Sequence, residues 1–257
     1  MNRIKTLFKQ KEKNILSVFC TAGYPNLDSL TQVLEALEKN GVDMVEIGMP
    51  FSDPTADGPV IQYSNTIAIN NGMQLKVLFE QLKDIRKKIS IPLVLMGYIN
   101  PALQYGMDNF LKDAATCGID GIIIPDLPMY EYETHYKTKF EQHNIQNIFL
   151  ITPQTSEQRI RKIDALSDAF VYVVSSNAIT GGQNSIEDTQ KQYFQKIKDM
   201  SLKNPVVIGF GIKDNETFNT ACAYANGAII GSAFIQALNN SKNISNDTFQ
   251  FINKIRS

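Results

Sequence analysis

The 257-residue sequence has little net charge, few cysteines and no long apolar run. Its 25 Lys and Arg residues nearly balance its 26 Asp and Glu residues, and its basic side chains do not cluster among aromatic ones. Both features argue against a nucleic-acid partner. No apolar run approaches the roughly 18 residues that a membrane-spanning helix requires. We therefore expect a protein that binds neither nucleic acid nor a membrane.

The three cysteines, Cys20, Cys117 and Cys222, are widely spaced and odd in number. They form neither a metal-spaced pair nor a disulfide framework, so the sequence predicts no metal site and reduced cysteines in apolar packing. The charged segment 1–13 precedes an apolar stretch that is too short for the core of a signal peptide. These features predict a cytoplasmic location.

Short apolar runs alternate with segments of helical periodicity along the whole chain. The runs are 15–20, 44–47, 92–96, 121–124, 147–151, 170–174, 205–208 and 227–230. The helical segments are 28–39, 59–71 with 73–88, 108–117, 130–143, 156–166, 186–199, 214–225 and 233–238. Parallel strands that are covered on both faces require continuous apolar runs of this kind.

Eight strand–helix alternations in a chain of this length predict an α/β fold, a single (β/α)8 TIM barrel that spans residues 1–257. Extra helices are expected at 4–8 and 247–255, where they would plug or brace the barrel. The alternative is an open doubly wound sheet, but no glycine-rich turn follows the first strand.

The segment 44–59, MVEIGMPFSDPTADGP, joins the end of a predicted strand to a proline-rich loop. Glu46 ends the strand and Asp57 lies in the loop, so both would lie at the face of the barrel that carries active sites. Burial would raise the pKa of Glu46 and allow it to act as acid and base near neutral pH. The structural alternatives are a rim ion pair for Glu46 and a helix-capping turn for Asp57.

Glycine-bearing turns follow the sixth, seventh and eighth predicted strands. Glycine lets backbone N–H groups approach an anion closely, and a short helix that opens at Ser232 would direct its N-terminus to the same place. We expect a phosphate site at these turns, although tight packing explains many loop glycines. Its residues would be Thr180, Gly181, Phe210, Gly211, Gly231 and Ser232.

Four apolar or aromatic residues near the predicted strand ends form a candidate slot for a flat ring. They are Phe19, Tyr172, Phe210 and Ile229. Inward-facing residues of this kind are also common in barrel cores, so each one fits a core role as well as a substrate contact.

Residues 46–59 resemble the signature of the tryptophan synthase alpha subunit family, E-[LIV]-G-x-P-F-S-D-P-x-A-D-G-P, at every fixed position. Similar stretches at 19–25, 125–128, 180–181, 209–212 and 231–233 extend the resemblance over nearly the whole chain. The resemblance implies cofactor-independent retro-aldol cleavage of indole-3-glycerol phosphate to indole and glyceraldehyde 3-phosphate. It implies that Glu46 protonates indole C3 and helps take the glycerol hydroxyl proton, while Asp57 binds the ring N–H. Tyr172 would pack near the reacting carbons, and Thr180 would help close its loop.

The same resemblance implies a pyridoxal phosphate-dependent beta subunit that receives the indole, in an alpha2beta2 heterotetramer. Asp53, Pro54 and Asn100 would face that partner. One departure is visible, because Ala178 stands where the family usually has Gly, and Ser176 stands where a larger residue is frequent. The loss of that Gly is expected to stiffen the loop after the sixth strand and to alter its closure.

Two other functions fit parts of this pattern. One is a different sugar-phosphate reaction on the same barrel, such as isomerisation or epimerisation, which an aromatic slot for indole argues against. The other is a non-catalytic regulatory partner of a beta subunit, which would not need Glu46 and Asp57.

Overall fold

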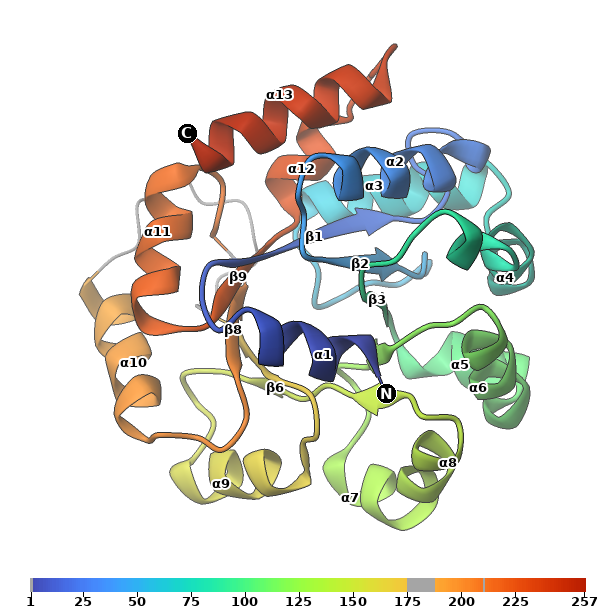
Figure 1. Cartoon of the computed structure of the whole chain (residues 1–257). Helices are drawn as coiled ribbons and strands as arrows, with labels where there is room; N and C mark the ends of the chain where they lie inside the picture. Colours follow the sequence, from blue (N-terminus) through green and yellow to red (C-terminus); the bar gives the residue numbers. More distant parts are fainter. Residues whose placement is uncertain (1, 175–187, 210) are drawn as a thin grey trace.

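The computed structural model describes residues 2–174, 188–209 and 211–257 (Figure 1). Its centre is a parallel sheet of nine strand segments in the order β5-β4-β3-β2-β1-β9-β8-β7-β6. The segments are β1 (Ile15–Thr21), β2 (Met44–Gly48), β3 (Leu93–Met96), β4 (Gly121–Ile123), β5 (Gln146–Asn147), β6 (Leu150–Ile151), β7 (Val171–Val174), β8 (Val206–Gly209) and β9 (Gly227–Ile230).

The two segments at the ends of this order, β5 and β6, are two parts of one continuous stretch of chain. The residues between β5 and β6 form backbone hydrogen bonds with both neighbouring strands, β4 and β7. The Ile148 N–H donates to the Ile122 carbonyl at 3.0 Å, and the Tyr172 N–H donates to the Phe149 carbonyl at 3.0 Å. The sheet therefore closes on itself around eight strand positions, and the predicted (β/α)8 barrel is confirmed.

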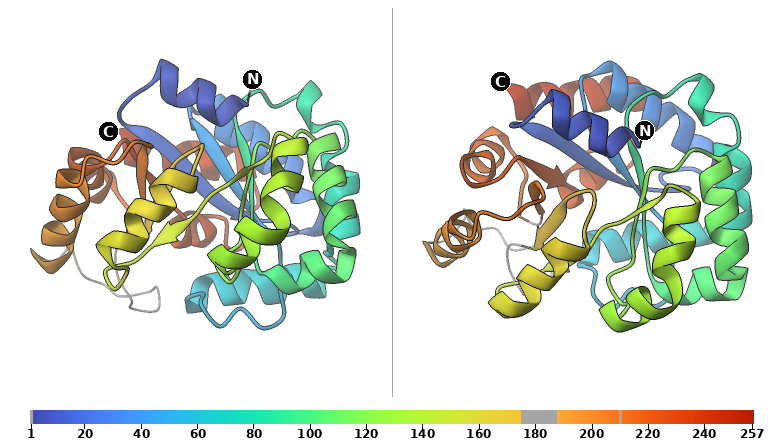
Figure 2. Two further views of the ribbon diagram at one scale, coloured as in Figure 1. Left: turned by 90° about the horizontal axis from the view of Figure 1, so that it is seen from below. Right: turned by 60° about the horizontal axis from the view of Figure 1, so that its bottom comes forward.

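Helices surround the barrel on its outer face (Figures 1 and 2). They are α2 (Leu30–Lys39), α3 (Pro59–Asn70), α4 (Leu75–Leu82), α5 (Ile99–Tyr105), α6 (Met107–Thr116), α7 (Met129–Glu131), α8 (Lys137–Gln142), α9 (Glu157–Leu166), α10 (Asp188–Asp199), α11 (Asn215–Tyr224) and α12 (Ser232–Ala237). The short turns η1 (Leu27–Ser29) and η2 (Ile85–Lys87) and the π-helix η3 (Tyr132–Tyr136) complete the connections.

Two predicted helices differ from the observed ones. The segment 73–88 divides into α4 and η2, and the segment 130–143 divides into α7, η3 and α8. Asn100 lies in the first turn of α5, where the following Pro101 is tolerated. Residues 186–187 of the predicted 186–199 helix lie outside the described residues.

The two extra helices act as predicted at the ends of the chain. Ile4 of α1 (Arg3–Gln10) is fully buried in the cluster that fills the barrel interior, so α1 plugs one end of the barrel. The left view of Figure 2 places α1 at the end opposite α3 and the loop before it. α13 (Ile244–Arg256) packs outside the barrel against α2.

Alternation along the strands separates two cores. Leu16, Val18 and Cys20 of β1 belong to the large cluster between the sheet and the helices. Met44, Val94, Tyr172 and Ile229 belong to the interior cluster. Because successive side chains of a strand point to opposite faces, Glu46 and Gly48 share the interior face with Met44. This periodicity places Glu46 inside the barrel, toward the end that carries the loop before α3.

Candidate functional site

Glu46 is a carboxyl group inside the apolar barrel, with none of its surface exposed to solvent. In the strand register it lies between Phe19 of β1 and Val94 of β3. Its Oε1 accepts a hydrogen bond from the Ser17 hydroxyl at 3.1 Å, whereas its Oε2 has no hydrogen-bond partner among the described residues. Burial raises the pKa of Glu46 from 4.5 to about 8, and the hydrogen bond from Ser17 opposes that rise. A carboxyl group in this state can hold a proton at neutral pH and release it.

Glu46 has no ion-pair partner in the described part of the chain. The rim ion pair considered from the sequence is therefore not observed for this residue within residues 2–174, 188–209 and 211–257. Its fully buried position is instead the one that the acid–base interpretation requires.

Asp57 lies in the loop between β2 and α3, and its carboxylate faces Tyr98, which follows β3. The Tyr98 hydroxyl donates to Asp57 Oδ2 at 3.3 Å and accepts from the Ala56 N–H at 3.0 Å. Burial raises the pKa of Asp57 from 3.8 to about 6, while the hydrogen bond from Tyr98 lowers it. Gly58, not Asp57, is the N-cap of α3, and it makes no side-chain cap hydrogen bond. The helix-cap alternative for Asp57 is therefore wrong.

A cavity opens at this end of the barrel and includes two of the predicted site residues, Phe19 and Asp57. Strand ends, the loop before α3 and α3 itself supply its wall. The lining residues are Phe19, Gly48, Met49, Ala56, Asp57, Ile61, Asn65, Met96, Gly97, Tyr98, Pro125 and Leu150. Glu46 lies one layer deeper, two residues before Gly48 on the same face of β2.

Tyr172 and Ile229, expected in the ring slot, both lie in the interior cluster rather than in the cavity wall. Tyr172 is 3% exposed, and its hydroxyl lies so close to Gly209 that a Cβ added there would be 2.1 Å away. Burial raises the pKa of Tyr172 well above 10, and the charges of Glu46 and Asp57 raise it further. The charges of Glu46 and Asp57 therefore both act on the Tyr172 hydroxyl. This is consistent with the two acids belonging to one site.

Part of the expected phosphate site lies in the described residues. Gly211 follows β8 with φ +77, a left-handed conformation that favours glycine. Gly231 is the N-cap of α12, and Ser232 begins that helix as predicted. Thr180, Gly181 and Phe210 lie outside the described residues, as do Ser176 and Ala178.

The residues expected to face a partner lie on the outer surface at the same end of the barrel. Asp53 is exposed and accepts a hydrogen bond from the Ser52 hydroxyl, and Pro54 is half-buried beside it. Asn100 is exposed on the first turn of α5.

Several cavity residues were missing from the sequence-based set, and Tyr98 is the most informative of them. It follows β3 in the same way that the loop with Asp57 follows β2, so the rule that barrel sites gather at strand ends could have found it. Asn65 and Ile61 had no comparable signal, because they lie within α3 and read as ordinary helix positions.

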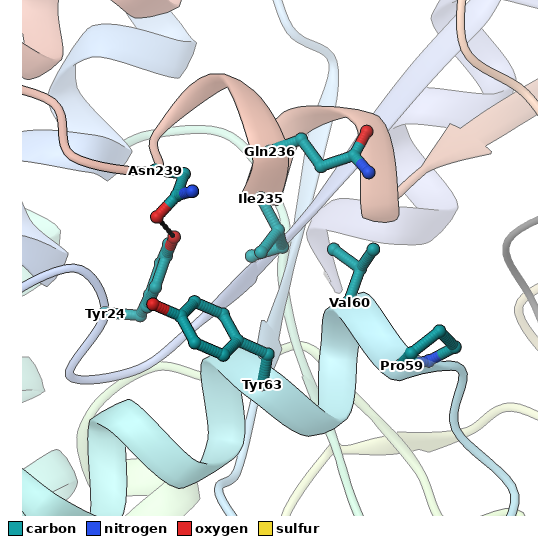
Figure 3. Close-up of a pocket in the computed structure, with 7 residues that line it drawn as sticks. All are labelled: Tyr24, Pro59, Val60, Tyr63, Ile235, Gln236 and Asn239. Carbon is teal, nitrogen blue, oxygen red and sulfur yellow. Dashed lines mark hydrogen bonds between the residues drawn. The ribbon is translucent and has the colours of Figure 1, made fainter.

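A second hollow lies between α3 and α12 and is shown in Figure 3. The Tyr24 hydroxyl donates to Asn239 Oδ1 at 3.3 Å across it, and Tyr63 projects from α3 beside Tyr24. No carboxylate, histidine or cysteine is among its lining residues, which are Tyr24, Pro59, Val60, Tyr63, Ile235, Gln236 and Asn239. The hollow therefore has no candidate general acid or base of that kind.

The described residues include no group of three or more His, Cys, Asp or Glu side chains that could hold a metal ion. Within the same residues, no helix has both the length and the apolar composition that crossing a membrane requires.

Comparisons with known proteins agree with the resemblance. The family model described as tryptophan synthase alpha chain matches residues 5–256. A tryptophan synthase alpha chain from Flavobacterium psychrophilum is 57% identical over 238 residues, which cover 93% of this chain and 94% of that relative. One from Flavobacterium johnsoniae is 54% identical over 256 residues and covers 100% of both chains. The crystal structure of tryptophan synthase subunit alpha from Legionella pneumophila superposes with a TM-score of 0.88 and 32% identity, covering 100% of this chain and 97% of that chain.

Proposed function

Because the chain belongs to the tryptophan synthase alpha chain family, a family of carbon–carbon lyases that cleave indole-3-glycerol phosphate, we propose that Glu46 and Asp57 are its catalytic residues. The observation that carries this proposal is the fully buried carboxyl group of Glu46 beneath the cavity that contains Asp57. Two acids whose surroundings push their pKa values apart can take different roles at one pH. Here the values are about 8 for Glu46 and about 6 for Asp57.

The protons balance if Glu46 begins the cycle protonated and Asp57 begins it ionised. Glu46 donates its proton to indole C3, and the positive charge that develops on the ring nitrogen is stabilised by the Asp57 carboxylate. The Glu46 carboxylate then takes the proton of the glycerol hydroxyl as the carbon–carbon bond breaks. The bond electrons return to the ring, which leaves as indole, while the other fragment becomes the aldehyde of glyceraldehyde 3-phosphate. Glu46 ends protonated, so no cofactor is needed for this sequence of steps.

The substrate's ring and phosphate would occupy different parts of the same barrel end. We assign the ring to the cavity beside Phe19, with Tyr172 and Ile229 beneath it as interior packing and Phe210 as a further wall. We assign the phosphate to the turns after β7, β8 and β9, through Thr180, Gly181, Gly211, Gly231 and Ser232. The left-handed conformation of Gly211 and the helix that begins at Ser232 support this assignment.

A beta subunit is the partner that this family implies. We propose an alpha2beta2 heterotetramer in the cytoplasm, in which the alpha chain forms one domain over residues 1–257 and the pyridoxal phosphate belongs to the beta subunit alone. Asp53, Pro54 and Asn100 would contact the beta subunit. Their position at the same end of the barrel as the cavity supports this proposal, since indole must pass from one subunit to the other.

The decisive experiment measures indole release from indole-3-glycerol phosphate by the isolated chain. We expect Glu46→Gln to abolish release, because an amide cannot exchange the proton, and Asp57→Asn to reduce it by about a hundredfold or more. The matched controls are Glu80→Gln and Asp84→Asn, which make the same changes at exposed side chains.

Three outcomes separate the functions considered from the sequence. Release that depends on Glu46 supports the lyase. Turnover of another sugar phosphate without indole release would support an isomerase or epimerase. A chain that releases no indole but still activates a beta subunit would be a regulatory partner. Near-normal release by folded Glu46→Gln would overturn the assignment of the acid–base residue.

A further inference from the structure

A serine occupies an apolar layer of the barrel interior. Ser17 of β1 is fully buried, and its register partners on the two neighbouring strands are Met44 and Ile229. Burying a hydroxyl group among such side chains is unfavourable unless it forms a hydrogen bond. The Ser17 hydroxyl forms one, to Glu46 Oε1 at 3.1 Å.

This bond makes the two oxygens of Glu46 unequal. Oε1 accepts from Ser17, while Oε2 is buried with no hydrogen-bond partner in the described part of the chain. A carboxyl group held at one oxygen has a restricted orientation, and its other oxygen is left to exchange a proton. A donor on the anchored oxygen also favours the ionised form, which Glu46 must reach in the middle of the proposed cycle.

We propose that Ser17 is a positioning residue for Glu46, holding Oε1 so that Oε2 exchanges the proton with the substrate. The proposal rests on the proposed role of Glu46. It adds a residue from β1 that makes no contact with the cavity and that acts only through the glutamate.

The titratable groups that interact with Glu46 do not obscure its titration. Cys20 on β1 and Tyr172 on β7 both interact with its charge, and burial raises the pKa of Cys20 to about 12 and that of Tyr172 well above 10. Asp57, the other acid near Tyr172, has a pKa of about 6. The neighbouring residue on β3 is the apolar Val94. Between about pH 7 and 9, Glu46 is therefore the group of this set that changes charge.

The test compares pH profiles of indole release for Ser17→Ala and the unaltered chain. Loss of a hydrogen bond to a charged group should move the alkaline limb to higher pH by about one pH unit. It should also lower kcat about tenfold while KM stays within about twofold, since Ser17 does not contact the cavity. Ser17→Thr, which restores a hydroxyl, should return the limb to its original position.

The matched control is Ser167→Ala, the same change at another fully buried serine, located between α9 and β7. It should leave the pH profile unaltered. An unchanged limb and unchanged kcat in Ser17→Ala would overturn the inference while Glu46→Gln still abolishes release. If Glu46→Gln itself turns over normally, it is the proposed function that fails.

Discussion

The Tyr98 hydroxyl donates a hydrogen bond to Asp57 Oδ2 at 3.3 Å. The same hydroxyl accepts from the Ala56 N–H at 3.0 Å, so the residue after β3 holds both the backbone and the carboxylate of the loop before α3. The ring of Tyr98 also packs on Phe51, with centroids 5.1 Å apart. The loop that carries Asp57 is thereby held by its neighbour in the barrel as well as by its own helix, because Gln62 Nε2 of α3 donates to the Asp57 carbonyl at 2.8 Å.

The roles proposed for the two acids predict the pH dependence of the isolated chain. Asp57 must be ionised, so activity should fall as pH drops through about 6. Glu46 must begin protonated, so activity should fall as pH rises through about 8. We expect a bell-shaped profile of kcat between these limbs, measured by indole release at saturating substrate. A profile that stays flat from pH 5 to 9 would contradict the proposed division of roles.

Tyr98→Phe should affect the acid limb alone. The hydrogen bond from Tyr98 lowers the pKa of Asp57, so its loss should raise that pKa and move the acid limb toward neutral pH. Activity at pH 6.5 should then fall several-fold more than activity at pH 8. The control is Tyr105→Phe, which removes a tyrosine–aspartate bond of 2.6 Å to Asp113 outside the cavity and should leave the profile as it was. Movement of the alkaline limb instead would show that Tyr98 acts on Glu46.

Glu46 should also lower the stability of the folded chain at alkaline pH. Its pKa in the fold, about 8, lies above the ordinary 4.5, so unfolding releases a proton between these values and stability falls as pH rises through this window. Glu46→Gln removes this effect. We expect its free energy of unfolding to match that of the unaltered chain near pH 4.5 and to exceed it by a few kcal/mol, on the order of 3, at pH 8.5.

Urea unfolding at the two pH values measures this difference. Glu80→Gln, at an exposed glutamate, is the control and should show no pH-dependent gain. Equal stability of Glu46→Gln and the unaltered chain at pH 8.5 would mean that the glutamate ionises in the fold as easily as it does in water.

The barrel was predictable from the sequence because each strand is a continuous apolar run and each helix has one apolar face. The sequence placed Glu46 at the end of its strand, but β2 continues to Gly48, so Glu46 lies one layer deeper than expected. Its hydrogen-bond partner Ser17 lies inside a run of β-forming residues, and a hydroxyl there gives no local signal of a partner 29 positions away. Strand register, which only the closed sheet defines, brings the two together.

Loop geometry was the less predictable part of the site. Asp57-Gly58-Pro59 reads as a capping turn, yet the cap is Gly58, and the aspartate turns toward Tyr98 through a contact 41 positions away. Such contacts form between loops that are far apart in the sequence, so the sequence of one loop alone does not predict them.

The Phe19 ring occupies the space that a side chain at position 48 would need. A Cβ added at Gly48 would lie 2.4 Å from Phe19 Cζ, far below contact distance, so Gly48→Ala must displace the ring. Since Phe19 and Gly48 both line the cavity, we expect about tenfold or greater loss of kcat/KM and a loss of stability of about 1–3 kcal/mol. Phe19→Ala in the same chain should remove the stability cost of the second change, which a double-mutant cycle measures. Additive costs would show that the two residues do not compete for space.

Asp120 connects three parts of the chain at the end of the barrel opposite the cavity. It is 3% exposed and accepts from Arg86 Nη2 at 2.6 Å, from the Leu93 N–H at 3.0 Å and from Arg3 Nη1 at 3.1 Å, so it joins α1 and η2 to the base of β3. Asp120→Ala leaves a largely buried guanidinium without its carboxylate, and we expect a loss of about 3–5 kcal/mol in urea unfolding. Asp84→Ala, which removes an exposed pair with Lys87, should cost far less. If the two variants lose similar amounts, the Asp120 cluster contributes no more to stability than an exposed ion pair does.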